Sequence, residues 1–295
     1  MRTEYNREGL RPEVQTILDQ MKASRMGPRD LSPAALRKND AAMAMVFAIG
    51  SPEIAVEREI TVAGAAGDLR AILYAPETAE GEVLPVIVHF HGGGFVIMTP
   101  ELSSRLCKEI AIGARAIIVN VEYRLAPETP YPGPMDDCEA AYRWVRAHAA
   151  EFGGDPSRVG VSGESAGGNF AAGVARRLAG TPEAPAGVGL LCAWLDLTMA
   201  SPSFRAFGPD DALIDDEMMT GWRDAYAPDP ALHTNPDVSP LFGEVSAYPP
   251  TCVVVGGIDP LYDDGANFAE KLRAAGRDVE LHDYPGLPHI FSFFP

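Results

Sequence analysis

The sequence predicts an α/β protein with a mostly parallel central sheet and helices on both of its faces. Short apolar runs, typical of buried strands, alternate with longer helical stretches along most of the chain. Polar and glycine-rich segments directly follow several of these strands, which is where sites lie in parallel α/β sheets. A length of 295 residues with a hydrophobic share of 46% suits one large domain with an added elaboration.

The individual elements follow from the apolar patterning. Strands are predicted at 57–62, 70–74, 84–90, 116–121, 158–161, 188–193, 251–255 and 279–284. Helices are predicted in the gaps, at 101–113, 137–150, 165–180 and 263–275. Ahead of the first strand, residues 12–26 place apolar side chains on one helical face, and Ser32 precedes Pro33 as the cap of a second helix. The apolar run 41–49 is about half a membrane span and predicts a packed helix.

A G-x-S-x-G motif at residues 163–167, with Ser165 at its centre, connects the strand at 158–161 to small residues that can begin a helix. This strand–turn–helix context is typical of the nucleophile elbow of serine hydrolases. The turn is too tight for a Cβ at the flanking glycines, and it exposes the serine hydroxyl. An ordinary Gly-Ser turn is the alternative, because the pentapeptide alone is a weak signal.

A second glycine-rich segment, His-Gly-Gly-Gly at 91–94, follows the strand at 84–90. Three glycines after a strand can turn backbone N–H groups toward the negative charge that develops in acyl transfer. A flexible loop and a phosphate cradle are the alternatives. No Lys-Ser/Thr pair follows, as a P-loop would require, so the oxyanion interpretation is favoured.

Two further residues complete the pattern. Asp259 comes just after the strand at 251–255, and His289 lies in the loop that follows the last predicted strand. The chain order serine, aspartate, histidine is the one expected of α/β-hydrolases. Asp259 could instead be a turn residue before Pro260.

Other aspartates and histidines fit these roles less well. Asp263 and Asp264 are better placed to cap the helix that follows them. His89 has apolar neighbours and is expected to be a packed core residue, while His91 is expected to brace the glycine loop. Nothing in the sequence supports a catalytic role for the three remaining histidines: His148, His233 and His282.

Taken together, these residues resemble the bacterial hormone-sensitive-lipase-like esterases, a branch of the α/β-hydrolases. The resemblance covers about residues 55–295 and includes the 91–94 loop, the segment Tyr-Arg-Leu-Ala-Pro-Glu at 123–128, the elbow, and the loops of the acid and the histidine. It implies a helical cap and a serine esterase whose catalytic residues are Ser165, Asp259 and His289. It also implies that the oxyanion is bound by the N–H groups of Gly93, Gly94 and Ala166. The 123–128 segment would tie loops together under the site.

The sequence departs from this family at two positions near the site. Glu164 stands where the family most often has Asp, and we expect its carboxylate to hold a neighbouring loop through hydrogen bonds. Ile290 follows the histidine where the family usually has Gly. Because a β-branched residue disfavours positive φ, we expect Ile290 to be extended or helical.

The Pro- and Asp-rich stretch 201–237 interrupts the alternation of strands and helices. It contains a helix at about 215–226 with four large residues on one side: Met218, Met219, Trp222 and Tyr226. We expect a discontinuous helical cap formed by residues 1–55 and 200–237, and a catalytic domain formed by 56–199 and 238–295. An ordinary surface excursion is the alternative. Under a cap, the substrate pocket would include Phe95, Leu213 and Ile214.

The predicted function is a carboxylesterase that cleaves short- to medium-chain esters, small-molecule substrates, without metal or organic cofactor. An amidase or a dedicated metabolite hydrolase could use the same triad, and a non-catalytic ligand-binding protein could share the fold. A net charge of −17 disfavours nucleic acid and anionic membranes as partners. The four cysteines form no CxxC pair, and the polar N-terminus shows no signal peptide, so a cytoplasmic enzyme is expected. The sequence leaves open whether the protein forms a homodimer.

Overall fold

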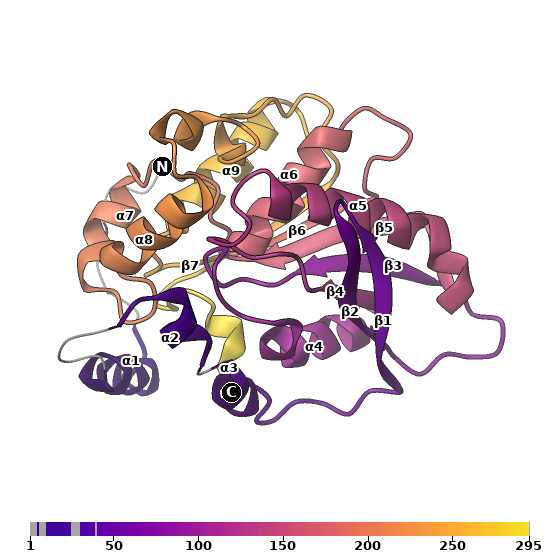
Figure 1. Ribbon diagram of the computed structural model, residues 1–295, viewed down its shortest axis with the longest axis horizontal. Helices are drawn as coiled ribbons and strands as arrows, with labels where there is room; N and C mark the ends of the chain where they lie inside the picture. Colours follow the sequence, from indigo (N-terminus) through magenta and orange to yellow (C-terminus); the bar gives the residue numbers. More distant parts are fainter. Residues whose placement is uncertain (1–4, 6–9, 25–29, 39, 295) are drawn as a thin grey trace.

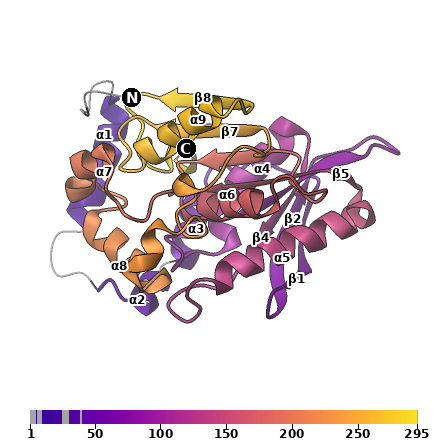
Figure 2. The same ribbon diagram turned by 90° about the horizontal axis from the view of Figure 1, so that it is seen from above.

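The computed structural model describes residues 5, 10–24, 30–38 and 40–294. These residues form one eight-stranded sheet of order β1-β2-β4-β3-β5-β6-β7-β8. The strand β2 runs antiparallel to β1 and β4, and the other neighbours are parallel. The strands are β1 (Val56–Gly64), β2 (Gly67–Ala75), β3 (Leu84–Phe90), β4 (Ile117–Val121), β5 (Gly154–Glu164), β6 (Val188–Leu191), β7 (Thr251–Gly256) and β8 (Val279–Tyr284). Figure 2 shows β1 and β8 at opposite ends of the sheet.

Helices cover both faces of the sheet. They are α1 (Pro12–Ser24), α2 (Pro33–Arg37), α3 (Asp40–Phe47), α4 (Ser104–Ala114), α5 (Gly133–His148), α6 (Ala166–Leu178), α7 (Pro202–Phe207), α8 (Asp216–Tyr226) and α9 (Tyr262–Ala274). In Figure 1, α4 lies below the sheet, whereas α5, α6 and α9 lie above it. Alternate strand residues divide between the two layers: Ile72 and Ile118 pack with α4, and their neighbours Leu73 and Val119 belong to the larger core. The α/β prediction is confirmed.

All eight predicted strands are present, with shifted ends. The strand β5 is longer than predicted. The strand β6 ends at Leu191, two residues early, because Cys192 has a φ of +46° and leaves the extended conformation. The helix predicted at 101–113 begins with a 3₁₀ turn at Pro100–Ser103 before α4. Among the described helices, none is long and apolar enough to span a membrane.

The N-terminal helices form where the sequence predicts them. Helix α1 ends at Ser24, and the last two residues of the predicted 12–26 helix lie outside the described residues. Ser32 Oγ accepts the Ala35 N–H at 3.3 Å and caps α2. The prediction of a packed helix at 41–49 is only half right: α3 buries Phe47, but Met45 is 71% exposed, because a two-turn helix lying on the surface can bury only one face.

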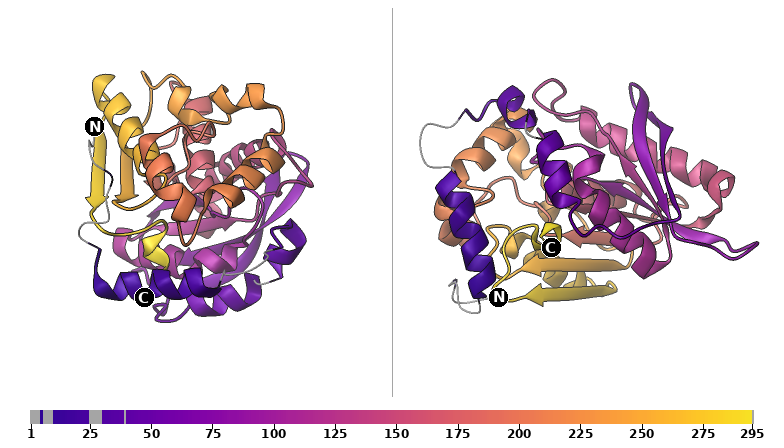
Figure 3. Two further views of the ribbon diagram at one scale, coloured as in Figure 1. Left: turned by 90° about the vertical axis from the view of Figure 1, so that its left-hand side faces the viewer. Right: turned by 90° about the horizontal axis from the view of Figure 1, so that it is seen from below.

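The insertion after β6 lies close to these N-terminal helices. In the left view of Figure 3, α7 and α8 (orange) lie above α1 to α3 (indigo). Lys22 of α1 makes a 2.6 Å ion pair with Asp210, and the Tyr5 ring contacts Phe207 edge-on, with ring centroids 6.2 Å apart. The two parts of the expected cap therefore contact each other.

Candidate active site

Ser165 lies at a tight turn between β5 and α6. Its φ and ψ are +54° and −119°, a strained conformation for a residue with a side chain. A Cβ on Gly163 would overlap the Gly167 carbonyl, and a Cβ on Gly167 would overlap the carbonyl oxygen of Phe90. The chain can make this turn only with glycine at both positions, which is the physical reason for the G-x-S-x-G spacing.

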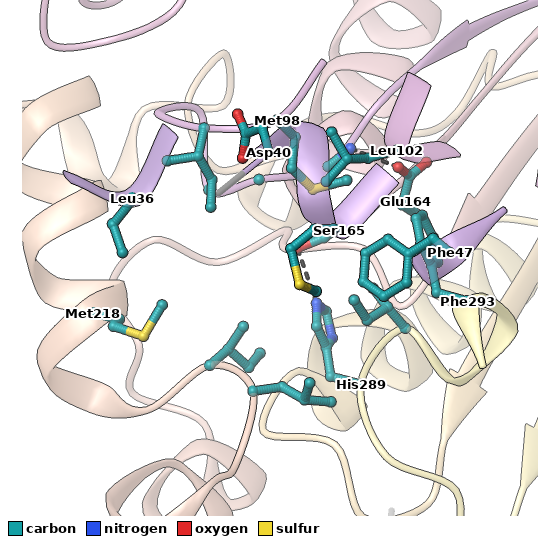
Figure 4. A pocket seen from close by; sticks show the side chains of 18 of the residues that line it. Leu36, Asp40, Phe47, Met98, Leu102, Glu164, Ser165, Met218, His289 and Phe293 are labelled. Carbon is teal, nitrogen blue, oxygen red and sulfur yellow. Dashed lines mark hydrogen bonds between the residues drawn. The ribbon is translucent and has the colours of Figure 1, made fainter. Parts of the chain in front are cut away.

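The structure brings the predicted acid, base and nucleophile together. His289 Nε2 lies 3.0 Å from Ser165 Oγ (Figure 4). On the other side of the ring, His289 Nδ1 lies 2.9 Å from Asp259 Oδ2. All three side chains are buried. The Leu261 N–H donates to Asp259 Oδ1 at 2.8 Å and so holds the carboxylate in place. In this arrangement the imidazole can take the serine proton while the aspartate fixes its tautomer.

Backbone contacts fix the acid loop against the histidine loop. The Gly257 N–H donates to Tyr284 O at 2.9 Å, and the Ile258 N–H donates to Leu287 O at 3.1 Å. A Cβ on Gly256 would lie 2.6 Å from the same Leu287 oxygen, so glycine is needed for this close approach. Two loops 30 residues apart in sequence thereby hold Asp259 and His289 side by side.

The prediction that Asp263 or Asp264 caps α9 is wrong, because both lie inside the first turn. There they accept hydrogen bonds from neighbouring segments instead. Asp263 accepts the Ser203 N–H at 2.8 Å and the Tyr5 hydroxyl at 2.7 Å. Asp264 accepts two backbone N–H groups from residues 195–196, and burial raises the pKa of its carboxyl group well above the usual value.

The glycine loop after β3 presents free backbone donors. Gly93 and Gly94 have φ values of +102° and +58°, and a Cβ on Gly94 would overlap the Trp222 ring. Among the described residues, neither of their N–H groups has an acceptor. The N–H of Ala166 belongs to the first turn of α6, where the helix dipole favours negative charge. All three predicted oxyanion residues therefore lie next to Ser165 or on the loop that lines the same cavity.

Two aromatic residues support this loop from behind. His91 Nδ1 lies 2.9 Å from Gly92 O, and its ring stacks on Tyr123 at a centroid distance of 4.4 Å. The Tyr123 hydroxyl donates to His91 O at 2.6 Å and to Gly92 O at 3.3 Å. Burial lowers the pKa of His91 to about 4, so its imidazole is neutral at pH 7. This geometry supports the bracing role expected for His91.

An apolar cavity of about 380 Å³ opens beside Ser165. Leu213 and Ile214 line it, as the sequence predicts. The placement of Phe95 in this pocket is wrong. Its φ of +68° turns the ring into the core, where it is fully buried and stacks on Tyr226 at 4.1 Å. Most lining side chains were not predicted: Met21, Leu36, Asp40, Met43, Phe47, Ile97, Met98, Leu102, Met218, Trp222, Ile290 and Phe293. The one sequence signal among them is the shared helical face of Met218 and Trp222.

The expectation for Ile290 is also wrong. Its φ and ψ are +44° and +35°, the left-handed region, and a 3₁₀ turn at Phe291–Phe293 follows directly. Phe293 packs edge-on against Phe47 of α3 at 5.1 Å, and Figure 1 shows the C-terminal segment beside that helix. The chain must reverse sharply after His289 to make this contact, and tertiary packing overrides the local preference of isoleucine.

One group of the described residues has the spacing of metal ligands. Cys192, Asp259 and His289 offer atoms that all lie within 4.8 Å of one another. Burial raises the pKa of the Cys192 thiol well above its usual value, which disfavours the thiolate that binds metals. Asp259 and His289 already bond each other. The donor set therefore fits an acid–base pair better than a metal centre.

Comparison with known proteins agrees with this geometry. Residues 87–293 match the family described as alpha/beta hydrolase fold. The chain belongs to the α/β-hydrolases. This α/β-hydrolase is 38% identical over 249 residues to Carboxylesterase NlhH of Mycobacterium tuberculosis, an alignment that covers 82% of the chain and 77% of that protein.

Solved structures give the same assignment. The α/β-hydrolase LAE6 from the metagenome of Lake Arreo, Spain, superposes with a TM-score of 0.88 at 34% identity, covering 97% of this chain and 93% of that one. The esterase of the archaeon Pyrobaculum calidifontis gives a TM-score of 0.90 at 30% identity, covering 97% and 92%. The present α/β-hydrolase is thus a hormone-sensitive-lipase-like esterase and a carboxylic-ester hydrolase, as the motifs predicted.

Proposed function

We propose that this esterase hydrolyses short- to medium-chain carboxylic esters through an acyl-enzyme on Ser165. The observation that carries the proposal is the continuous line of contacts from Asp259 through His289 to Ser165 at the wall of an apolar cavity. An acid, a base and a nucleophile in hydrogen-bond reach of one another are the parts that acyl transfer requires.

The reaction follows from these positions. Ser165 Oγ bonds to the ester carbonyl carbon while His289 Nε2 takes the hydroxyl proton. The carbonyl oxygen becomes an oxyanion and accepts hydrogen bonds from the N–H groups of Gly93, Gly94 and Ala166. His289 then returns the proton to the leaving alcohol, and water repeats both steps on the acyl-enzyme. The Asp259 carboxylate stabilises the imidazolium throughout.

The cavity limits the substrate. A volume of about 380 Å³ is at the low end of the roughly 300–1,000 Å³ that small-molecule sites span, so a short ester fills it. Among the residues that the structure describes, no Lys or Arg lines the cavity, whereas the carboxyl groups of Asp40 and Glu164 do. Together with the net charge of −17, this lining disfavours anionic substrates and favours uncharged esters.

An acyl-length series tests the proposal. Turnover of p-nitrophenyl esters should be highest for short to medium chains and fall for long ones, and matched p-nitroanilides should react far more slowly. Faster cleavage of the anilides would indicate an amidase. Ser165→Ala should stay folded, lose covalent labelling by a fluorophosphonate and lose about 10³-fold or more in kcat. Near-normal turnover by this variant would refute the assignment of Ser165.

Cellular location and assembly stay predictions. The cytoplasmic location expected from the polar N-terminus is tested by fractionation of the native host. The homodimer left open by the sequence is tested by light scattering on the purified protein. Neither bears on the triad, whose three residues come from one chain.

A further inference from the structure

We propose that Glu164 and His89 form a buried pair that positions the oxyanion loop. The inference rests on the proposed function and adds two positioning residues to it. Neither residue belongs to the triad, and neither is an oxyanion donor. Both are ionisable side chains that are almost wholly buried beneath the site, at 1% and 0% exposure.

Glu164 contacts the glycine loop directly. Its Oε1 accepts the Gly92 N–H at 2.7 Å, and Figure 4 shows the carboxylate on the side of the cavity away from His289. The residue precedes the nucleophile in sequence, yet its side chain points to the loop that follows the neighbouring strand β3. A carboxylate placed there without donors would be strongly unfavourable, because burial removes its water.

His89 supplies the second contact. Its Nε2 lies 2.7 Å from Glu164 Oε2, although this close contact lacks the geometry of an aligned hydrogen bond. Its Nδ1 lies 2.8 Å from Ser162 Oγ. The parallel register of β3 and β5 pairs His89 with Ser162, which sets the ring in place beside Glu164. The imidazole is thereby held between Ser162 and the buried carboxyl group of Glu164.

The pair acts on catalysis through Gly92, whose N–H belongs to the His91–Gly92 peptide and whose carbonyl belongs to the Gly92–Gly93 peptide. Glu164 holds the Gly92 N–H, and His91 and Tyr123 hold the Gly92 carbonyl from behind. In a planar trans peptide the N–H points opposite to the carbonyl, so a fixed Gly92 carbonyl aims the Gly93 N–H at the cavity. Glu164 therefore anchors the N-terminal side of Gly92, and His91 and Tyr123 anchor its carbonyl, so Glu164 helps to fix the direction of the Gly93 oxyanion donor.

The test compares Glu164→Ala with Glu164→Gln. Glutamine keeps a side-chain oxygen for the Gly92 N–H, whereas alanine removes it. With p-nitrophenyl acetate, Glu164→Ala should lower kcat by about 10- to 100-fold, less than the full loss of an oxyanion donor, and change KM by less than about threefold. Glu164→Gln should restore most of the lost kcat. His89→Ala should cost more kcat in the parent than in Glu164→Gln, because only the parent has a carboxyl group at position 164 for the imidazole to contact.

Asp137→Asn is the matched control, since Asp137 is another buried carboxylate that accepts a backbone N–H, from Ala65 at 3.0 Å. It should lower the melting temperature and leave kcat unchanged. The proposal is overturned if Glu164→Gln is as slow as Glu164→Ala, if only KM changes, or if Asp137→Asn loses as much kcat for the same loss of melting temperature. Ser165→Ala keeps the two hypotheses apart: if it is inactive while Glu164→Ala is normal, only this inference fails.

Discussion

Arg37 of α2 fastens the N-terminal helices to the catalytic domain, and its removal tests whether those helices belong to the substrate site. Its Nε donates to Val96 O and its Nη2 to Ala126 O, both at 2.8 Å. The guanidinium also binds both carboxylate oxygens of Glu128, at 2.8 and 2.9 Å. One side chain thus joins α2 to the loop after the oxyanion glycines and to the 123–128 segment that was expected to tie loops together.

The expected effect can be worked out from these contacts. The Glu128 side chain is 62% exposed, so the ion pair contributes at most about 1 kcal/mol. Each charge-assisted bond to a partly buried carbonyl contributes about 1.5 kcal/mol, of which water at the freed carbonyls recovers a part. Arg37→Ala should therefore weaken docking of the N-terminal helices by about 3 kcal/mol, which increases the undocked population roughly 100-fold.

Hydrogen exchange and an acyl series measure this effect. Amides of α2 and α3 should exchange faster in Arg37→Ala while those of the sheet do not change. KM should rise more for medium-chain esters than for acetate, because Leu36, Met43 and Phe47 line the cavity. Arg37→Lys keeps the charge but not the forked geometry, so its exchange rates and KM values should lie between those of the parent and of Arg37→Ala. Parental exchange and an unchanged acyl profile in Arg37→Ala would refute the reasoning.

Three further predictions concern the acid, the buried histidine and the N-terminal segment. Asp259→Asn should lose far more kcat than Asp263→Asn, whose carboxylate only ties segments together; the reverse order would mean that the acid is misassigned. Because the pKa of His91 is about 4, the unfolded chain alone binds that proton between pH 6.5 and 4, and stability should fall by up to about 3 kcal/mol as pH drops through this window. In thermal melts at decreasing pH, the melting temperature of His91→Gln should fall less steeply than that of the parent. An identical dependence on pH would contradict this prediction. Deletion of residues 1–50 should cause aggregation or change acyl preference, and a soluble truncated enzyme with the parental profile would argue against the cap.

The triad could be predicted because each of its signals is local. Ser165 is marked by glycines that the turn physically requires. Asp259 follows the apolar strand β7, and His289 follows β8, in which Val279 and Leu281 alternate with polar residues. Strand order and register were not needed for these assignments. The catalytic residues lie at the ends of strands, and turn residues in the sequence predict where strands end.

The contact between His89 and Glu164 could not be predicted in the same way. It depends on which strands are neighbours and on their register, and the two residues are 75 positions apart. Because its sequence neighbours are apolar, His89 was interpreted as a core residue. The structure confirms that it is buried, but the sequence does not reveal its contact with Glu164. The cavity wall is harder still, because it combines side chains from α1, α2, α3, α8 and the C-terminal turn. Helical periodicity indicates a buried face and does not say what that face is buried against.

The wrong predictions for the Phe95 side chain and for the Ile290 backbone have one cause, a positive φ at a residue that disfavours it. Ile290 offers the sharper test. Left-handed backbone costs isoleucine about 1–2 kcal/mol, while loss of its half-buried side chain costs a similar amount. The free energy of unfolding of Ile290→Gly should therefore lie within about 1 kcal/mol of the parental value. This estimate includes the roughly 0.5–1 kcal/mol by which the greater entropy of glycine stabilises the unfolded chain. Ile290→Ala loses the side chain and keeps the strain, so it should melt below Ile290→Gly. Both variants should widen the cavity beside His289 and raise the turnover of bulky esters relative to acetate. If Ile290→Gly instead melts below Ile290→Ala, the turn after His289 is not strained, and isoleucine suits it for a reason other than packing against α3.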